Sequence, residues 1–145
     1  MLKLIFKDVG QWDSIIIEWI ESSISKIVII DCNLYNGRNP VLNHLIDNKY
    51  NEIEYLILSH PHYDHFSGMN EIIEYYANNN FNIKYFLHTS KQVPDFLKMA
   101  ANSAICEREL QKLFLSLRKY TDVLNMKVAL VQYDFPSNTI PCKRY

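Results

Sequence analysis

Residues 60–65 read His-Pro-His-Tyr-Asp-His and directly follow a short apolar run that is typical of a buried strand. Imidazole nitrogens and carboxylate oxygens are common ligands of divalent metals, and His60, His62, Asp64 and His65 supply four of them. His60 and His62 are two positions apart, so in an extended segment they point to the same side. The spacing predicts that they bind one metal, and that Asp64 and His65, after a turn, bind a second.

Two divalent ions about 3.5–4 Å apart can share a hydroxide, polarise the scissile bond and stabilise the leaving oxygen. We therefore expect a metal-dependent hydrolase that uses a metal-bound hydroxide. Asp64 is the expected catalytic residue, because it would bind a metal and also steer the hydroxide. These ligand types favour zinc, with two ions if the site is complete, and they also admit manganese or iron.

Residues 59–68, Ser-His-Pro-His-Tyr-Asp-His-Phe-Ser-Gly, resemble the metal-binding signature of the metallo-β-lactamase superfamily. Residues 6–17 resemble the opening strands of that fold, and residues 28–32 resemble the strand with its early aspartate. The resemblance covers roughly residues 2–90, and it is closest to the metallo-β-lactamase-like domain of bacterial DNA-uptake channel proteins. It implies an α/β fold of the αββα sandwich type.

The family fold needs about twice the length of this chain, and its remaining metal ligands come from the later half. Only one histidine, His88, follows His65 in the sequence. The resemblance therefore implies a short or half version of the sandwich, with a mixed sheet and flanking helices. We expect one domain over residues 1–145 that corresponds to the N-terminal half of the full fold, with a helical segment at residues 92–121.

Two further residues are candidates for the site. Asp31 ends an apolar strand, and the resemblance implies that it orients the ligand loop, as carboxylates next to metal ligands do. A turn aspartate that caps a loop is the alternative. His88 follows a second apolar strand, where the family more often places a pocket residue than a ligand. A solvent-facing strand end is the alternative for His88.

We expect strands at residues 2–6, 14–19, 26–30, 54–58, 83–87 and 127–133. The pattern also predicts a helix at 40–48 with Asn39 as its N-cap, and a helix at 68–77 capped by Ser67. A long amphipathic stretch at 94–120 is expected to be helical, with a break at 102–103.

The amino-acid composition indicates which partners and which cellular compartment to expect for the protein. Hydrophobic residues make up 48% of the chain and the net charge is −1, so no basic field points to tight nucleic-acid binding. The three cysteines are widely spaced and odd in number, which favours a reducing compartment. No apolar run is long enough to span a membrane. We expect a cytoplasmic protein without a membrane partner.

Two functions remain open from the sequence. The first is hydrolysis of a phosphodiester or another phosphate ester, with a small molecule or a nucleic acid as substrate. The second is a non-catalytic or truncated chain that binds metal weakly, or that needs a partner chain or a second copy of itself to supply the missing ligands. The number of metal ions held by the purified chain would separate the two.

Overall fold

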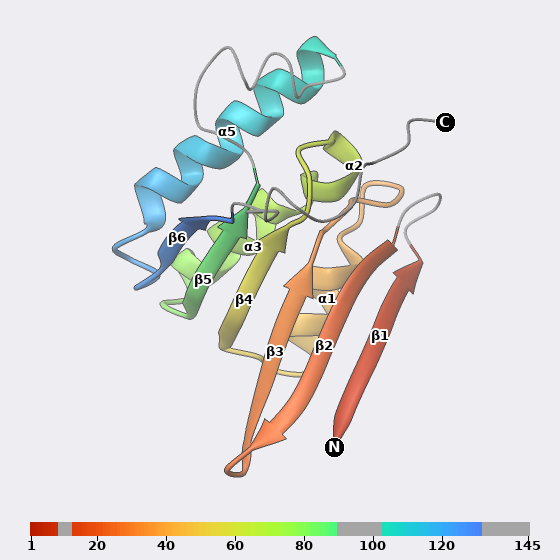
Figure 1. The fold of residues 1–145 in the computed structure, drawn as a ribbon, viewed down its shortest axis with the longest axis vertical. Coiled ribbons are helices and arrows are strands. Elements are labelled where there is room, and N and C mark those ends of the chain that lie inside the picture. Colours follow the sequence, from red (N-terminus) through yellow and green to blue (C-terminus); the bar gives the residue numbers. More distant parts are fainter. Residues whose placement is uncertain (9–12, 90–102, 132–145) are drawn as a thin grey trace, which may run out of the picture.

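The computed structural model describes residues 1–8, 13–89 and 103–131, and Figure 1 shows their arrangement. The strands are β1 (Leu2–Asp8), β2 (Asp13–Glu21), β3 (Ile24–Ile30), β4 (Glu52–Leu58), β5 (Asn82–His88) and β6 (Lys127–Leu130). The helices are α1 (Pro40–Asp47), α2 (Tyr63–Phe66), α3 (Met69–Asn78) and α5 (Ala104–Tyr120).

The six strands form one mixed sheet in the order of the chain. β1, β2 and β3 pair antiparallel, and β3, β4, β5 and β6 pair parallel. The turn between β2 and β3 places Ser22 at φ 50° and Ser23 at φ 67°. Two successive left-handed residues are the geometry of a tight hairpin turn, which fixes the register of this pair.

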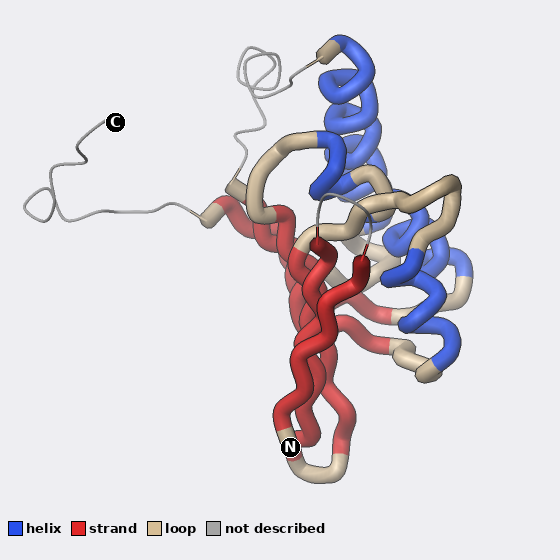
Figure 2. The backbone as a smooth tube through the Cα atoms, turned by 90° about the vertical axis from the view of Figure 1, so that its right-hand side faces the viewer, coloured by secondary structure: helices blue, strands red, loops and turns tan. Residues whose placement is uncertain are grey.

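The described helices lie on one face of the sheet (Figure 2). Each parallel strand is reached through a helical connection, and such connections are almost always right-handed. Because β3 to β6 follow one another in a single direction across the sheet, right-handed connections place every helix on the same side. The result is an α/β fold with a mixed six-stranded sheet and flanking helices, consistent with a partial form of the expected sandwich.

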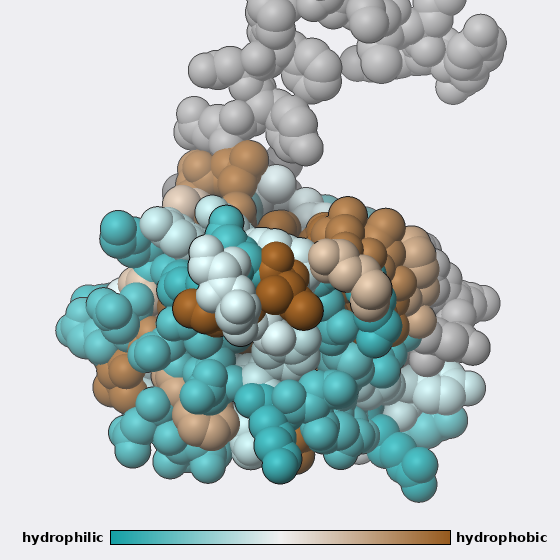
Figure 3. Space-filling model, turned by 90° about the horizontal axis from the view of Figure 1, so that it is seen from below, coloured by the Kyte–Doolittle hydropathy of each residue, from teal (hydrophilic) through white to brown (hydrophobic). Residues whose placement is uncertain are grey.

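The core lies between this helix layer and the sheet. One row of side chains crosses the strands on the covered face, and its four central members, Ile16, Ile29, Leu56 and Phe86, are fully buried. Burial of apolar side chains such as these is the main favourable term in folding. The end of the molecule seen from below in Figure 3 is mostly hydrophilic and includes the asparagine-rich loops at residues 48–51 and 80–82.

The expected elements are largely confirmed. The six strands form within two residues of their expected bounds, except that β6 ends at Leu130, and residues 132 and 133 lie outside the described part. Asn39 caps α1, because its side chain accepts a hydrogen bond from the Leu42 backbone N–H. The expected break in the long helix coincides with Ser103, the N-cap of α5, and residues 92–102 of the predicted helical segment are not described.

Ser67 as the N-cap of a helix was a wrong prediction. A separate four-residue helix, α2, precedes α3, and Gly68 is the N-cap of α3. The Ser67 hydroxyl instead accepts a hydrogen bond from the Leu34 N–H and donates one to Asn33 Oδ1. It therefore ties the loop after β3 to the end of α2. None of the helices in the described ranges is long and apolar enough to cross a membrane.

Candidate metal centre

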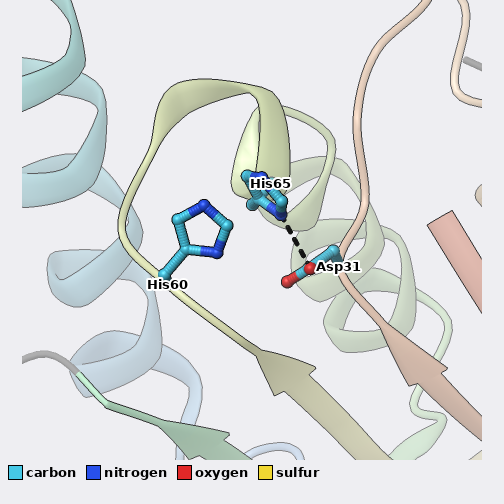
Figure 4. Close-up of side chains that lie close together, drawn as sticks. All are labelled: Asp31, His60 and His65. Carbon is cyan, nitrogen blue, oxygen red and sulfur yellow. Dashed lines mark hydrogen bonds and ion pairs between the residues drawn. The ribbon is translucent and has the colours of Figure 1, made fainter. Parts of the chain in front are cut away.

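The candidate ligands gather where β3 and β4 end. These strands are parallel, so their carboxyl ends meet at the same edge of the sheet, where sites in α/β folds form. Asp31 directly follows β3, His60 follows β4 by two residues, and His65 lies in α2. Figure 4 shows the three side chains pointing toward one another. Their possible ligand atoms all lie within 4.8 Å of one another.

Asp31 is the hydrogen-bonding centre of this group. Its Oδ1 accepts from the Ser59 N–H at 2.8 Å, and its Oδ2 accepts from the Ser59 hydroxyl at 2.6 Å. The same Oδ2 lies 2.8 Å from His65 Nδ1. Because a carboxylate can only accept here, Nδ1 of His65 carries the proton and Nε2 keeps its lone pair. This is the arrangement in which histidine ligates a metal.

Hydrogen bonding also holds His60 in a tautomer that can ligate a metal. Its Nδ1 lies 3.0 Å from the Ser59 hydroxyl oxygen. That hydroxyl already donates its proton to Asp31, so the His60 Nδ1–H is the donor in this contact and Nε2 keeps its lone pair. Burial lowers the pKa of His60, and the neighbouring His65 and His62 lower it further. The ring is therefore neutral at pH 7, which is the ligating form.

Asp64 and His62 lie beside this pair. Asp64 Oδ2 is 3.6 Å from His65 Nε2. Two ligands that each lie about 2.1 Å from one tetrahedral ion are roughly 3.4 Å apart, so this separation fits a shared divalent metal. The ring of His62 is exposed and meets the ring of His60 edge-on, with their centroids 4.8 Å apart. The His60 and His65 centroids are only 3.6 Å apart.

Among the described residues, the structure clusters His60 and His65 of the four predicted ligands together with Asp31, while Asp64 and His62 lie beside this cluster. The Asp31 carboxylate already has three hydrogen-bonding partners around its two oxygens. Its geometry fits a group that orients His65 better than a ligand with free lone pairs.

His88 lies elsewhere. It is 3% exposed, so it is not a solvent-facing strand end. Its ring meets the ring of Phe114 of α5 edge-on at a centroid distance of 5.1 Å, and it pairs with Leu58 across the parallel strands. Among the described residues, the clustered donors comprise Asp31, His60 and His65, without His88.

Ser59 is the residue of this site that the sequence did not single out. It connects Asp31 to His60 through one hydroxyl. The available signal was its position, since a hydroxyl residue that directly precedes the first ligand can reach both the preceding strand end and that ligand.

Backbone contacts hold α2 in place. The Cys32 N–H donates to the His65 carbonyl at 2.8 Å, and the Gly68 N–H donates to the Cys32 carbonyl at 2.9 Å. On the other side, the Cys106 thiol in the first turn of α5 lies 3.6 Å from the Pro61 carbonyl. The ligand loop is therefore held between the end of β3 and the start of α5.

Comparison with known proteins gives one match. Residues 25–98, just over half of the chain, match the model of the Metallo-beta-lactamase superfamily. This range includes the end of β3, the ligand loop, α2 and β5. No curated protein and no solved structure matches the chain.

Proposed function

The chain belongs to the metallo-beta-lactamase superfamily, and from that premise we propose that it is a metal-dependent hydrolase acting on a phosphodiester or another phosphate ester. The observation that carries the proposal is the hydrogen bonding of the two ring nitrogens of His65. Asp31 holds its Nδ1, and its Nε2 faces Asp64 at 3.6 Å. A histidine fixed in this way beside a carboxylate has the chemistry of a metal site.

Each residue has a distinct proposed role. His60 and His62 would hold one ion, and Asp64 and His65 would hold a second, with zinc as the expected metal and manganese or iron as alternatives. A bound ion would polarise the phosphoryl oxygen and lower the pKa of a water molecule. Asp64 would orient a water molecule toward phosphorus, while Asp31 and Ser59 fix the two imidazoles in the tautomer that can ligate a metal.

One feature supports a phosphate ester. The opening strands and the ligand loop resemble the metallo-β-lactamase-like domain of bacterial DNA-uptake channel proteins. The net charge of −1 supplies no attraction for an anionic substrate, so a bound metal would have to supply it. We propose the cytoplasm as the location, because the described cysteines Cys32 and Cys106 are free and buried, as expected for a reducing compartment.

The experiment is hydrolysis of bis(p-nitrophenyl) phosphate by the full chain loaded with zinc or manganese. Asp64→Ala is expected to lower kcat by about 100-fold or more, since it removes both a ligand and the group that orients the water. Asp47→Ala, which changes an exposed aspartate at the end of α1, is the matched control and should keep full activity. The far-UV circular dichroism of both variants should match that of the unchanged chain. Undiminished turnover by Asp64→Ala would contradict the proposed mechanism.

A non-catalytic role is the second candidate. The motif ligands all come from one loop and one short helix, and the only later histidine of the sequence packs against Phe114. This distribution favours a site that a partner completes. Metal analysis of the purified chain separates the candidates, because two tightly held ions per chain support the hydrolase and one loosely held ion supports the incomplete site.

A further inference from the structure

A short hairpin follows Asp31 at the edge of the sheet where the candidate metal centre lies. The Tyr35 N–H donates to the Arg38 carbonyl and the Arg38 N–H donates to the Tyr35 carbonyl, both at 2.9 Å. Between them, Asn36 has φ 50° and Gly37 has φ 71°. Two successive left-handed residues with the sequence Asn-Gly match a two-residue type I′ turn. This turn fixes the backbone of residues 35–38, which we call the Tyr35–Arg38 hairpin.

The two residues that close the hairpin present an aromatic ring and a guanidinium side by side. Tyr35 and Arg38 are paired directly opposite each other, and the side chains of such a pair point to the same side with their Cβ atoms about 5 Å apart. Tyr35 is 45% exposed, and Arg38 is exposed as well. Within the described ranges, no carboxylate forms an ion pair with Arg38. Both side chains are therefore available to a ligand.

A cavity opens beside this pair. Its volume is about 510 Å³, and it is lined by Tyr35, Asn36, Arg38, Pro40 and Asn43. Pockets for small molecules are typically about 300–1,000 Å³ and combine apolar or aromatic surface with a few polar groups. The lining of this cavity supplies an aromatic ring, a positive charge and two side-chain amides.

The hairpin is attached to the helix that carries two of the predicted ligands. The Cys32 N–H donates to the His65 carbonyl at 2.8 Å, and the Leu34 N–H donates to the Ser67 hydroxyl at 2.8 Å. Figure 1 shows the loop after β3 beside α2. Tyr35 follows Cys32 by three residues, so their Cα atoms are at most about 11 Å apart. An oligonucleotide is long enough to contact the cavity and the candidate metal centre at the same time.

We propose that the cavity beside the Tyr35–Arg38 hairpin binds a nucleoside monophosphate unit of the substrate. Nucleobases of every kind stack on aromatic side chains, and the arginine guanidinium binds phosphate oxygens through two parallel hydrogen bonds. A ring and a guanidinium side by side thus match the base and the phosphate of one nucleotide. Tyr35 stacks the base, and Arg38 binds the phosphate.

This assignment deepens the proposed hydrolase function and rests on it for the position of the phosphate that is hydrolysed. The next phosphate along the same strand lies at the metal centre. The base that stacks on Tyr35 must be free of a complementary strand, because a paired base has both faces inside the duplex. The substrate class is therefore a single-stranded oligonucleotide.

The test measures AMP binding by the full chain, with and without zinc, through the backbone amide resonances of residues 34–38 in NMR spectra. AMP should bind there with a dissociation constant of about 1 mM or lower in both conditions. Ribose 5-phosphate, which lacks the base, should bind about 10-fold or more weakly, because it cannot stack on Tyr35. Unchanged resonances at residues 34–38, or equal affinities for the two probes, would overturn the proposal.

Three variants separate the two contacts. Arg38→Ala should weaken the binding of AMP and of ribose 5-phosphate alike, by about 10-fold or more, because both probes lose the charged hydrogen bonds. Tyr35→Ala should weaken only AMP, by about 10-fold or more, and Tyr35→Phe should keep the affinity because it keeps the ring. Arg108→Ala, which changes a 67% exposed arginine of α5, is the control and should bind AMP like the unchanged chain. AMP binding that survives Arg38→Ala would also overturn the proposal.

The binding measurement is independent of hydrolysis, so the two proposals fail in different ways. AMP binding at the hairpin without turnover of bis(p-nitrophenyl) phosphate would contradict the proposed function alone. Turnover without AMP binding at the hairpin would contradict the nucleotide site alone.

Discussion

At the residue scale, the site depends on one unusual backbone conformation. Asp31 has φ 59°, in the left-handed region that a non-glycine residue enters at a cost of about 1 kcal/mol or more. Its N–H still donates to the Ile57 carbonyl at 2.9 Å, and its carboxylate accepts two hydrogen bonds from Ser59. These contacts offset the cost and aim the carboxylate at His65. The strained residue is therefore the one that sets the tautomer of a metal ligand.

Ser59→Ala tests this connection. The change removes the hydroxyl that lies between Asp31 and His60, while the backbone N–H bond to Asp31 stays. We expect zinc affinity, measured by competition with a chromophoric chelator, to fall by about 10-fold or more, as for other partners of metal ligands.

Ser59→Thr keeps the hydroxyl and should restore most of this affinity. Ser25→Ala, which changes an exposed serine of β3, should have no effect. An affinity in Ser59→Ala equal to that of the unchanged chain would show that the hydroxyl does not position the ligands.

At the element scale, the junction of α2 and α3 fits closely against the loop after β3. A Cβ atom at Gly68 would lie 2.7 Å from Cys32 Sγ and 2.9 Å from Asn39 Nδ2. Asn39 is itself engaged, because its side chain caps α1 and donates to the Gly68 carbonyl. Glycine is therefore required here for close approach, and this junction determines where α2 presents Asp64 and His65.

Gly68→Ala should lower the free energy of unfolding by about 1–3 kcal/mol, the usual cost of overpacking. Urea denaturation followed by circular dichroism measures the change. Cys32→Ala in the same chain removes the nearest clashing atom, so the double variant should lose less than the sum of the two single changes. Simple additivity would mean that the sulfur does not limit this junction.

At the scale of the whole molecule, a partly buried cluster of charges joins three neighbouring strands. Glu54 of β4 accepts hydrogen bonds from Lys26 of β3 and from Lys84 of β5. Burial alone would raise the pKa of Glu54, but the hydrogen bonds from the two lysines outweigh it and hold the pKa below its ordinary value. The ionised carboxylate thus stabilises the sheet across its parallel part.

The pH dependence follows from this lowered pKa. The unfolded carboxyl titrates near 4.5, so the stabilisation is complete above that pH and is lost as the pH falls through the lower folded value. Glu54→Gln should lose roughly 1–2 kcal/mol of unfolding free energy at pH 7, and the difference should narrow in acid below pH 4.5. Urea titrations at several pH values measure it. Glu21→Gln, at an exposed position, is the control, and a Glu54→Gln deficit that persists unchanged in acid would contradict the prediction.

The sequence by itself determined the local parts of this protein. The motif ligands lie within six consecutive residues, so their proximity follows from covalent connection and needs no tertiary contact. The strands and the helices other than α2 also followed from short-range periodicity and from the Asn39 cap. The prediction of Ser67 as a helix N-cap was wrong because its hydroxyl bonds to a residue 33 positions away, and local sequence patterns do not reveal such a contact.

Only the tertiary structure decided how distant residues combine. The pairing of Asp31 with His65 joins positions 34 apart, and it exists because the parallel register brings the ends of β3 and β4 to one edge. The coverage of the sheet by helices on one face has the same origin. Alternating apolar residues on every strand fit burial on both faces, and the handedness of the connections, not the pattern, determined which face the helices cover.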